Sequence, residues 1–341
     1  MNHFVKRSLP RTLGSTALLM LALVALVATW HMGASRSEPY RWARVTNDAG
    51  WSPSYWLAVE PFRGRLWLFG HPAGSWVSTD ARSWEQVEVL GDAPRGDNRY
   101  VVFNEEVYAV GGVTDRSNLT GAAVWKSSDG SRWQLITDSP PWSARVMHAV
   151  TVVGDRLWLL GGYDGRYLSD VWTSADGKDW VVATAEAPWA GRAMHSAAVF
   201  AGEVWVTGGR RDMDSWWETT FNDVWHSRDG RVWTRSASRA AWSKRYGHAS
   251  AAWDGRLWIL AGTRLWRKND VWHSTDGSRW TQLEGEVPWS GRFGLATGVF
   301  DDKLWVVGGK EGGARFLNDV WSLERSATSG PRAEAGEGKH R

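Results

Sequence analysis

The feature that most restricts the fold of this chain is an internal repeat. The tetrad Trp-x-x-Arg occurs four times at spacings of 47, 53 and 47 residues, beginning at Trp142, Trp189, Trp242 and Trp289. An apolar strand follows each copy, and then a second strand that ends in small residues, as in Leu157–Gly162. Two earlier second strands, at 65–70 and 106–112, bring the number of units to six. Repeats of this length predict a ring or array of equivalent modules.

Each unit contains the signals of four antiparallel strands. A third strand carries Asp-Val-Trp, as at Asp170, and the motif Ser-x-Asp-Gly-x-x-Trp follows, as from Ser127 to Trp133. Asp-Gly between two aromatic-bearing runs predicts a hairpin with a type I′ turn, in which both central residues have positive φ. Four such strands in each unit predict an all-β fold, a six-bladed β-propeller of four-stranded antiparallel blades.

The two ends of the repeat predict how the ring closes. The sixth unit stops after Trp321 without a fourth strand, whereas Arg41 and Trp42 align with the fourth strands of other units. The N-terminal strand is therefore expected to complete the last blade and to cover two exposed sheet edges. The predicted domains are a signal peptide or membrane anchor with a short linker at 1–39, the propeller at 40–324, and a disordered tail at 325–341.

The N-terminus indicates export. Lys6, Arg7 and Arg11 precede an uncharged, largely apolar stretch at 12–30. A positive start followed by an apolar run is typical of a cleaved signal peptide or of a single uncleaved anchor, and both alternatives stay open. Either one places the propeller outside the cytoplasm, periplasmic or secreted, with membrane contact only through the N-terminal segment.

Charge and cysteine content exclude several classes of function. The leader and the tail hold +3 and +1 of the formal charge of +3, so the body between them carries about −1. Nucleic-acid binding needs a clustered basic face, and none is present in the repeat. The chain has no cysteine, which excludes disulfides, thiolate metal sites and cysteine nucleophiles. No cofactor, metal or catalytic residue is expected.

At this point the repeat resembles a known family. Arg192, His195, the pair Gly208–Gly209, the segment Asp223–Trp225 and Trp233 resemble the kelch repeat, including its form in galactose-oxidase-like propellers, over about residues 40–323. The Ser-x-Asp-Gly hairpin is similar to a shortened Asp-box of sialidases, which implies a structural turn. Galactose oxidase chemistry implies a copper site with a Tyr–Cys crosslink, which a chain without cysteine excludes. Six-bladed kelch propellers also include exported sialic-acid mutarotases, which implies an arginine and a carboxylate without a cofactor.

Strand direction places the loops between strands 2 and 3 and the loops between blades on one face, called the loop face. Repeated arginines gather there and suit a small anion, or they pair with the repeat aspartates and hold the loops together; they are Arg95, Arg145, Arg192, Arg245 and Arg292. His148, His195 and His248 each lie three residues after one of these arginines. Because they occupy equivalent positions in consecutive blades, they are spread around an arc and do not converge on one metal ion. We interpret these histidines as structural.

The least repeat-like segment is a long loop in the fourth blade. It combines charged and aromatic side chains, and blade five adds one more tryptophan; the set is Arg210, Arg211, Trp216, Trp217, Glu218 and Trp266. Exposed aromatics beside charges suit sugar stacking or a protein contact. The sequence thus predicts an extracytoplasmic kelch-type propeller that binds or scaffolds a protein or a carbohydrate on its loop face. The alternative is a cofactor-independent, carbohydrate-active enzyme such as a sialic-acid mutarotase-like epimerase.

Overall fold

The computed structural model of the chain describes residues 39–112, 121–212 and 219–326. Residues Tyr40–Arg325 form one compact unit. The predicted leader at 1–38 and the predicted tail from 327 onwards lie outside the described residues. Within the part of the chain that is described, no helix is long and apolar enough to cross a membrane.

The described residues contain 24 strands in six antiparallel four-stranded sheets. Blade 1 consists of β2 (Ala58–Phe62), β3 (Arg65–His71), β4 (Gly74–Ser78) and β5 (Glu85–Val87). Blade 2 consists of β6 (Arg99–Phe103), β7 (Glu106–Gly111), β8 (Ala123–Ser127) and β9 (Gln134–Thr137). Blade 3 consists of β10 (Ala149–Val153), β11 (Arg156–Tyr163), β12 (Tyr167–Ser174) and β13 (Trp180–Thr184). Blade 4 consists of β14 (Ser196–Phe200), β15 (Glu203–Thr207), β16 (Val224–Ser227) and β17 (Thr234–Ala237). Blade 5 consists of β18 (Ala249–Trp253), β19 (Arg256–Leu260), β20 (Val271–Ser274) and β21 (Thr281–Gln282). Blade 6 consists of β22 (Ala296–Phe300), β23 (Lys303–Lys310), β24 (Phe316–Arg325) and β1 (Tyr40–Thr46).

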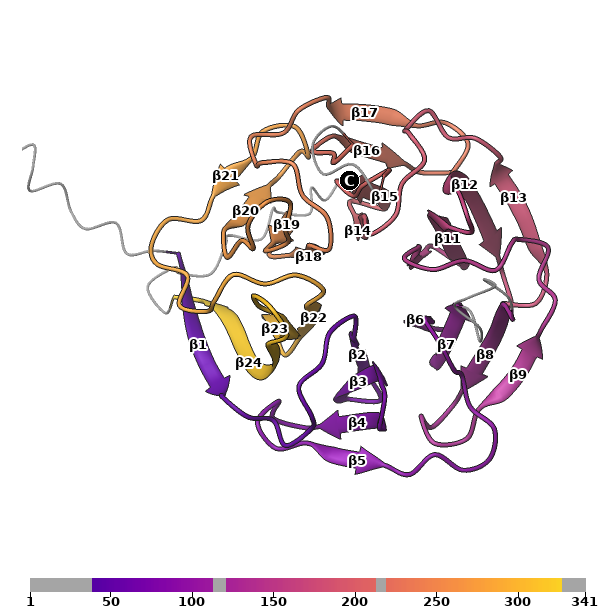
Figure 1. Cartoon of the computed structure of the whole chain (residues 1–341), viewed down its shortest axis with the longest axis horizontal. Helices are drawn as coiled ribbons and strands as arrows, with labels where there is room; N and C mark the ends of the chain where they lie inside the picture. The colour runs from indigo at the N-terminus through magenta and orange to yellow at the C-terminus, as the bar shows by residue number, and fades with distance from the viewer. Residues whose placement is uncertain (1–38, 113–120, 213–218, 327–341) are drawn as a thin grey trace, which may run out of the picture. The chain divides into compact units, whose positions relative to one another are not determined.

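The six blades stand around a common axis, so the predicted β-propeller is confirmed (Figure 1). The first strand of each blade lies nearest the centre, and each of these inner strands contacts the inner strand of the next blade. The fourth strands form the rim. Because consecutive strands in a blade run in opposite directions, the two kinds of hairpin share the face opposite the loop face, which we call the hairpin face.

The ring closes as the sequence predicts. Strand β1 pairs antiparallel with β24, with Trp42 opposite Leu323. The Trp42 ring meets the Trp289 ring edge-on at 5.5 Å, as Trp142 meets Trp180 at 5.8 Å in blade 3. The N-terminal strand therefore occupies the same packing position as the fourth strand of an ordinary blade.

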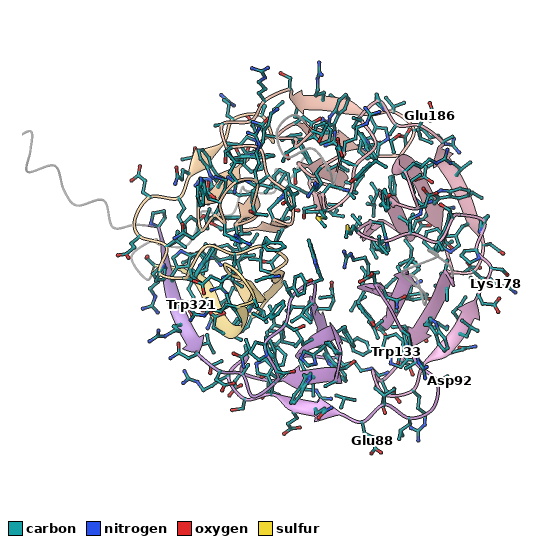
Figure 2. All side chains as sticks on the ribbon, in the orientation of Figure 1. Glu88, Asp92, Trp133, Lys178, Glu186 and Trp321 are labelled. Atoms are coloured by element: carbon teal, nitrogen blue, oxygen red, sulfur yellow. The ribbon has the colours of Figure 1, made fainter. Side chains whose placement is uncertain are left out.

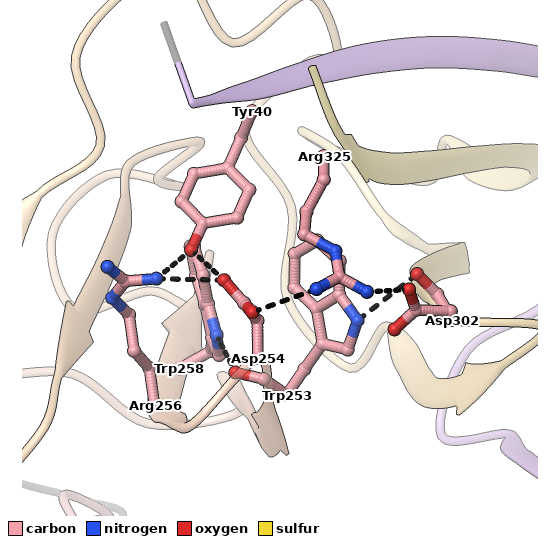
Figure 3. Close-up of polar contacts among 7 residues, drawn as sticks. All are labelled: Tyr40, Trp253, Asp254, Arg256, Trp258, Asp302 and Arg325. Atoms are coloured by element: carbon pink, nitrogen blue, oxygen red, sulfur yellow. Dashed lines mark hydrogen bonds and ion pairs between the residues drawn. The ribbon is translucent and has the colours of Figure 1, made fainter. Parts of the chain in front are cut away.

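A polar cluster fastens this closure at the hairpin face (Figure 3). The Tyr40 hydroxyl donates to the Asp254 carboxylate at 2.5 Å, and the Arg256 guanidinium contacts both groups. Arg325, at the end of β24, pairs with Asp254 and with Asp302. Both ends of the propeller thus lie at the hairpin face and leave the loop face clear of them.

Side chains fill the spaces between neighbouring blades (Figure 2), and many of those buried there are aromatic. The second-strand tryptophans are buried, and the rings of Trp67, Trp158 and Trp205 lie on the turn glycine of the following blade. A Cβ atom on Gly130 would lie 2.2 Å from the Trp67 ring, and one on Gly277 would lie 1.9 Å from the Trp205 ring. The glycine in the Ser-x-Asp-Gly motif is therefore required by the neighbouring blade as well as by its own turn.

The predicted type I′ turns are wrong. Only the glycine has positive φ, as at Gly130 with φ of 77°, and the aspartate before it does not. The Asp129 carboxylate instead accepts hydrogen bonds from the backbone N–H groups of Ser131 and Arg132, each at 2.8 Å. Side-chain capping of a longer connection replaces the two-residue turn, because the aspartate can satisfy two backbone donors at once.

Candidate ligand-binding site at the loop face

In blades 3 to 6 the repeated arginine is an internal staple. Arg145 Nη1 and Nη2 lie 2.7 and 2.9 Å from the two carboxylate oxygens of Asp170. The same bidentate pair joins Arg192 to Asp223, Arg245 to Asp270, and Arg292 to Asp319. All four arginine side chains are at most 1% exposed. Each pair fixes the loop that enters a blade to the third strand of that blade.

These staples use the hydrogen-bonding capacity of the guanidinium groups. Besides Asp170, the five N–H donors of Arg145 reach the carbonyl and hydroxyl of Ser143 and the carbonyl of Gly161. Arg245 has the same set of partners in blade 5. Beside Arg192, Ala190 takes the place of this serine. The Arg192 guanidinium carbon lies over the Phe221 ring, 4.3 Å from its centroid. Arg145 and Arg245 therefore have no N–H left for a ligand.

Charge pairing also fixes the ionisation state of the aspartates. Burial alone would raise the pKa of Asp223, but hydrogen bonds from Arg192 and its positive charge outweigh burial and hold that pKa below its ordinary value. Asp270 behaves in the same way beside Arg245. These two pairs are thus ionised at neutral pH, and removing one partner would leave a buried charge without compensation.

Blades 1 and 2 lack the staple. Blade 1 has Ser54 at the arginine position and Gly74 at the aspartate position. Blade 2 keeps Arg95 but has Ala123 in its third strand where the aspartate would stand. Arg95 is exposed, and none of the described residues forms an ion pair with its side chain. This arginine is therefore the one whose charge is directed to solvent.

A cleft of about 440 Å³ lies beside Arg95, at the junction of the two unstapled blades. Its lining combines cations, a carboxylate and aromatic rings from both blades; the side chains used below are Tyr55, Trp56, His71, Arg95, Asp97 and Arg99. The His71 Nε2 atom is hydrogen-bonded to the carbonyl oxygen of Ser52 at 2.8 Å, so His71 lines the cleft without offering Nε2 as a free donor. This volume suits a small polar ligand.

A second cavity, of about 180 Å³, lies among the inner strands. Two of its lining residues break the repeat. Arg99 is the first residue of β6, and the other five inner strands begin with alanine or serine. Glu60 is the third residue of β2, where the other blades carry Val, Thr, Ala or Gly. A cation and a carboxyl group thus line a channel whose other lining residues are mainly small or apolar, together with three histidines.

Glu60 is a protonated acid at neutral pH. Burial raises the pKa of its carboxyl to about 8, and no hydrogen bond or ion pair of this carboxyl is found among residues 39–112, 121–212 and 219–326. A carboxylic acid in this state can donate a proton at pH 7 and accept one after it. The Arg99 Nε atom donates to the carbonyl of His148 at 3.0 Å, which fixes the guanidinium between blades 2 and 3.

Two of the three histidines form a hydrogen bond to the preceding blade. His148 Nε2 lies 3.1 Å from the carbonyl of Val110 in blade 2, and His248 Nε2 lies 2.9 Å from the Thr207 hydroxyl in blade 4. Burial lowers the pKa of His195 to about 3, so this imidazole is neutral. No cluster of three potential metal ligands exists in the described part of the chain. The geometry agrees with the structural interpretation of these histidines.

Three of the residues predicted around the fourth-blade loop lie in the described part of the chain. Arg210 is buried, donates to the Asp212 carbonyl at 3.0 Å and stacks on Tyr246, whereas Arg211 is exposed. Trp266, 79% exposed, lies in the loop between β19 and β20 of blade 5. Blade 5 stands across the ring from blade 2 (Figure 1). Trp216, Trp217 and Glu218 lie outside the described residues. The predicted site formed by these six residues therefore stays a prediction.

Glu60, Tyr55, Trp56 and Arg99 were missed by sequence reasoning. The signal that could have found them is the repeat register, because each inner strand begins at the same place in its unit. Aligning the six strands places an arginine and a glutamate at two positions that otherwise hold small or apolar residues. Departures from an internal repeat mark positions that the common scaffold does not require.

Comparison with known proteins agrees with this architecture. The kelch motif matches residues 144–173, which run from the Arg145 staple into the third strand of blade 3. No curated protein matches the sequence. A solved structure described as that of YjhT is similar, with a TM-score of 0.67 and 14% identity, over 83% of this chain and 98% of that chain. At this identity the similarity concerns the fold.

Proposed function

We propose that this kelch-type six-bladed propeller is an extracytoplasmic binding module that holds an acidic sugar in the cleft between blades 1 and 2. The observation that carries the proposal is the missing staple. Four blades use their arginine internally, and blade 2 presents Arg95 to solvent at the edge of a cleft. A guanidinium recognises a carboxylate through two parallel hydrogen bonds, and here the third-strand aspartate that takes them in blades 3 to 6 is replaced by Ala123.

The remaining lining of the cleft suits a saccharide. Tyr55 and Trp56 present neighbouring aromatic rings with centroids 5.9 Å apart. An aromatic face can pack on the apolar side of a sugar ring, and polar groups at the edge of the site bind its hydroxyls. Asp97 and Arg99 line the same cleft and supply such polar groups. A carboxylated monosaccharide satisfies both features.

Isothermal titration calorimetry tests this function. The propeller is titrated with glucuronate, galacturonate and N-acetylneuraminate, and with glucose as the uncharged reference. We expect an acidic sugar to bind and glucose not to. The Arg95→Ala variant should weaken binding at least about tenfold, since loss of a charge-assisted pair costs more than ~1.4 kcal/mol.

The matched control is Arg82→Ala. Arg82 is also an exposed arginine, but it lies in the hairpin between β4 and β5, on the hairpin face. Its removal changes the net charge by the same amount and should leave affinity unchanged. Binding that is equally weak in both variants would indicate a general charge effect, and no binding of any acidic sugar would refute the proposal.

A second candidate function is sugar conversion in the channel. The observation that favours it is the protonated Glu60 carboxyl in a cavity that Arg99 also lines. An acid that holds its proton at neutral pH is suited to general acid–base catalysis at a sugar ring oxygen, and no cofactor is needed. The resemblance to kelch-type sialic-acid mutarotases implies the same pair of residue types.

Anomer exchange measured by nuclear magnetic resonance tests this second function. The propeller should accelerate interconversion of the α and β anomers of N-acetylneuraminate. Glu60→Gln, which keeps the shape and removes the acid, should abolish the acceleration while leaving calorimetric binding intact. Exchange at the uncatalysed rate in the wild type would reject this candidate and leave the binding module.

The extracytoplasmic location rests on the positive, then apolar, N-terminal sequence. Cell fractionation with protease protection tests the location. Propeller recovered from the cytoplasm of intact cells would contradict it.

A further inference from the structure

The mouth of the channel is bounded by a belt of residues in the left-handed conformation. They stand two positions before the inner strand, and their φ values are 60° at Trp56, 58° at Met147, 54° at Met194, 61° at Gly247 and 62° at Gly294. Each of four donates its backbone N–H to the carbonyl of the preceding blade's belt residue, at 2.7–3.0 Å. At blade 2 the belt residue is Asp97, which does not share this conformation.

Trp56 has a dedicated seat on this belt. A Cβ atom on Gly247 would lie 3.0 Å from Cη2 of Trp56, and one on Gly294 would lie 3.3 Å from its Cδ2. Blades 3 and 4 carry methionine at the same belt position. The glycines of blades 5 and 6 therefore leave the space that the indole occupies. The Trp56 ring reaches from blade 1 toward blades 5 and 6, across the mouth of the channel.

Trp56 and Arg99 are shared by two cavities. Both line the 440 Å³ cleft at the loop face and the 180 Å³ cavity among the inner strands. The Arg99 guanidinium lies over the Trp56 ring, 5.7 Å from its centroid. The two side chains thus separate the cleft from the channel.

We propose that Trp56 is a plug of the channel, and that Arg99 is the contact through which a ligand in the cleft releases it. The first part is independent of the ligand, and the second rests on the proposed binding function. A sugar whose carboxylate is held by Arg95 presents its hydroxyl oxygens to Arg99, and hydrogen bonds from the charged guanidinium to these oxygens are about twice as strong as neutral ones. These bonds outweigh a cation–π contact to one indole ring. With the plug released, cleft and channel form one site, in which Glu60 is accessible to the ligand.

The absence of cysteine permits a direct test. Ser196→Cys places a single thiol in the channel lining, because Ser196 begins β14 and lines the inner cavity. The rate of its alkylation by fluorescein-5-maleimide is measured with Trp56 and with Trp56→Gly. Glycine is the residue that blades 5 and 6 carry at this belt position, and it adopts positive φ without strain. We expect the rate to rise about tenfold or more when the indole is removed.

Trp56→Phe is the matched control, because it keeps an aromatic ring on the same seat and should raise the rate much less. Equal rates with Trp56 and Trp56→Gly would overturn the plug, since the reagent would then reach the channel without passing the indole. Circular dichroism of each variant shows that the fold is intact.

The release step is tested in the Ser196→Cys protein with glucuronate as the probe. We expect faster alkylation when the probe is added, and no acceleration in the Arg99→Gln background. Calorimetric binding without faster alkylation would refute release while keeping the proposed function. A rate that rises with Trp56→Gly, in a protein that binds no acidic sugar, would keep the plug and refute the binding function.

Discussion

Blades 3 to 6 and blades 1 and 2 have the same four strands but use the loop before the inner strand differently. In the first group, called here the stapled blades, a buried arginine pairs with an aspartate of the third strand. In blades 1 and 2 the pair is absent, and a cleft lies at their junction. The comparison indicates that the staple is a structural element of the repeat, and that its loss provides a surface where function can be placed.

The largest difference between the two groups of blades is expected when one staple is removed. Asp270→Ala leaves the Arg245 guanidinium buried without its partner, whereas Arg95→Ala in blade 2 removes only an exposed side chain. We expect the first substitution to lower the free energy of unfolding by about 3–5 kcal/mol. The second should change it by less than about 0.5 kcal/mol. Urea denaturation of both variants measures this, and equal losses would remove the distinction between the two groups of blades.

Glu60 and the staple aspartates should respond to pH in opposite directions. The Glu60 pKa is raised from 4.5 to about 8 in the folded protein, so the unfolded chain loses this proton first. The Glu60 contribution to stability is therefore lost as pH rises from about 4.5 to 8. At pH 9 Glu60→Gln should be more stable than the wild type by roughly 3 kcal/mol, with the difference vanishing near pH 4. The lowered pKa of Asp270 instead makes the staple weaken only toward acid pH.

Chemical denaturation at pH 4, 7 and 9 measures the difference between Glu60→Gln and the wild type. A constant difference at all three values would mean that the Glu60 carboxyl is ionised in the folded protein and would contradict its assignment as a neutral acid.

A staple can also be built into blade 2. Ala123 stands where the staple aspartate stands in blade 3, so Ala123→Asp offers Arg95 the missing partner. We expect a gain of about 1 kcal/mol in stability, typical of a partly exposed ion pair. The same substitution should weaken acidic-sugar binding, because it draws Arg95 away from the cleft. Thermal denaturation and calorimetry together test this exchange; unchanged binding in a stabilised variant would show that Arg95 is not the ligand contact.

The smallest expected effect is a loss of stability that is the same in blades 1 and 2 as in the stapled blades. The turn aspartates Asp129 in blade 2 and Asp276 in blade 5 both accept backbone N–H groups two and three residues later, at 2.8–2.9 Å. Replacing either with alanine should cost about 1 kcal/mol. Similar losses in urea denaturation would show that the blades differ in their staples and not in general stability. Unequal losses would indicate that the unstapled blades are weaker throughout.

The fold could be predicted from the sequence because it is repeated. The second strands and the Asp-Gly turns recur in register, and Trp42 aligns with the fourth-strand tryptophans of the other units. The strands assigned in one unit can therefore be checked against the others. The turn type was wrong because the pair Asp-Gly does not reveal that Asp129 caps backbone donors with its carboxylate. Side-chain hydrogen bonding of this kind depends on the length of the connection.

The candidate site was harder to predict for the opposite reason. Arg95 was recognised as a member of the repeated arginine series, but Glu60 and Trp56 have no counterpart in the other units, so the repeat does not explain them. Their importance depends on two cavities that only the closed ring creates, between strands far apart in the sequence. Trp266 stood out as an unusual exposed residue, yet exposure alone did not place it beside the cleft.

The most direct test of the account is a crystal structure of the propeller with glucuronate. The account predicts the sugar between blades 1 and 2, with its carboxylate against the Arg95 guanidinium and the four staples of blades 3 to 6 unchanged. Sugar bound at the Trp266 loop, or a carboxylate held by one of the stapled arginines, would contradict it.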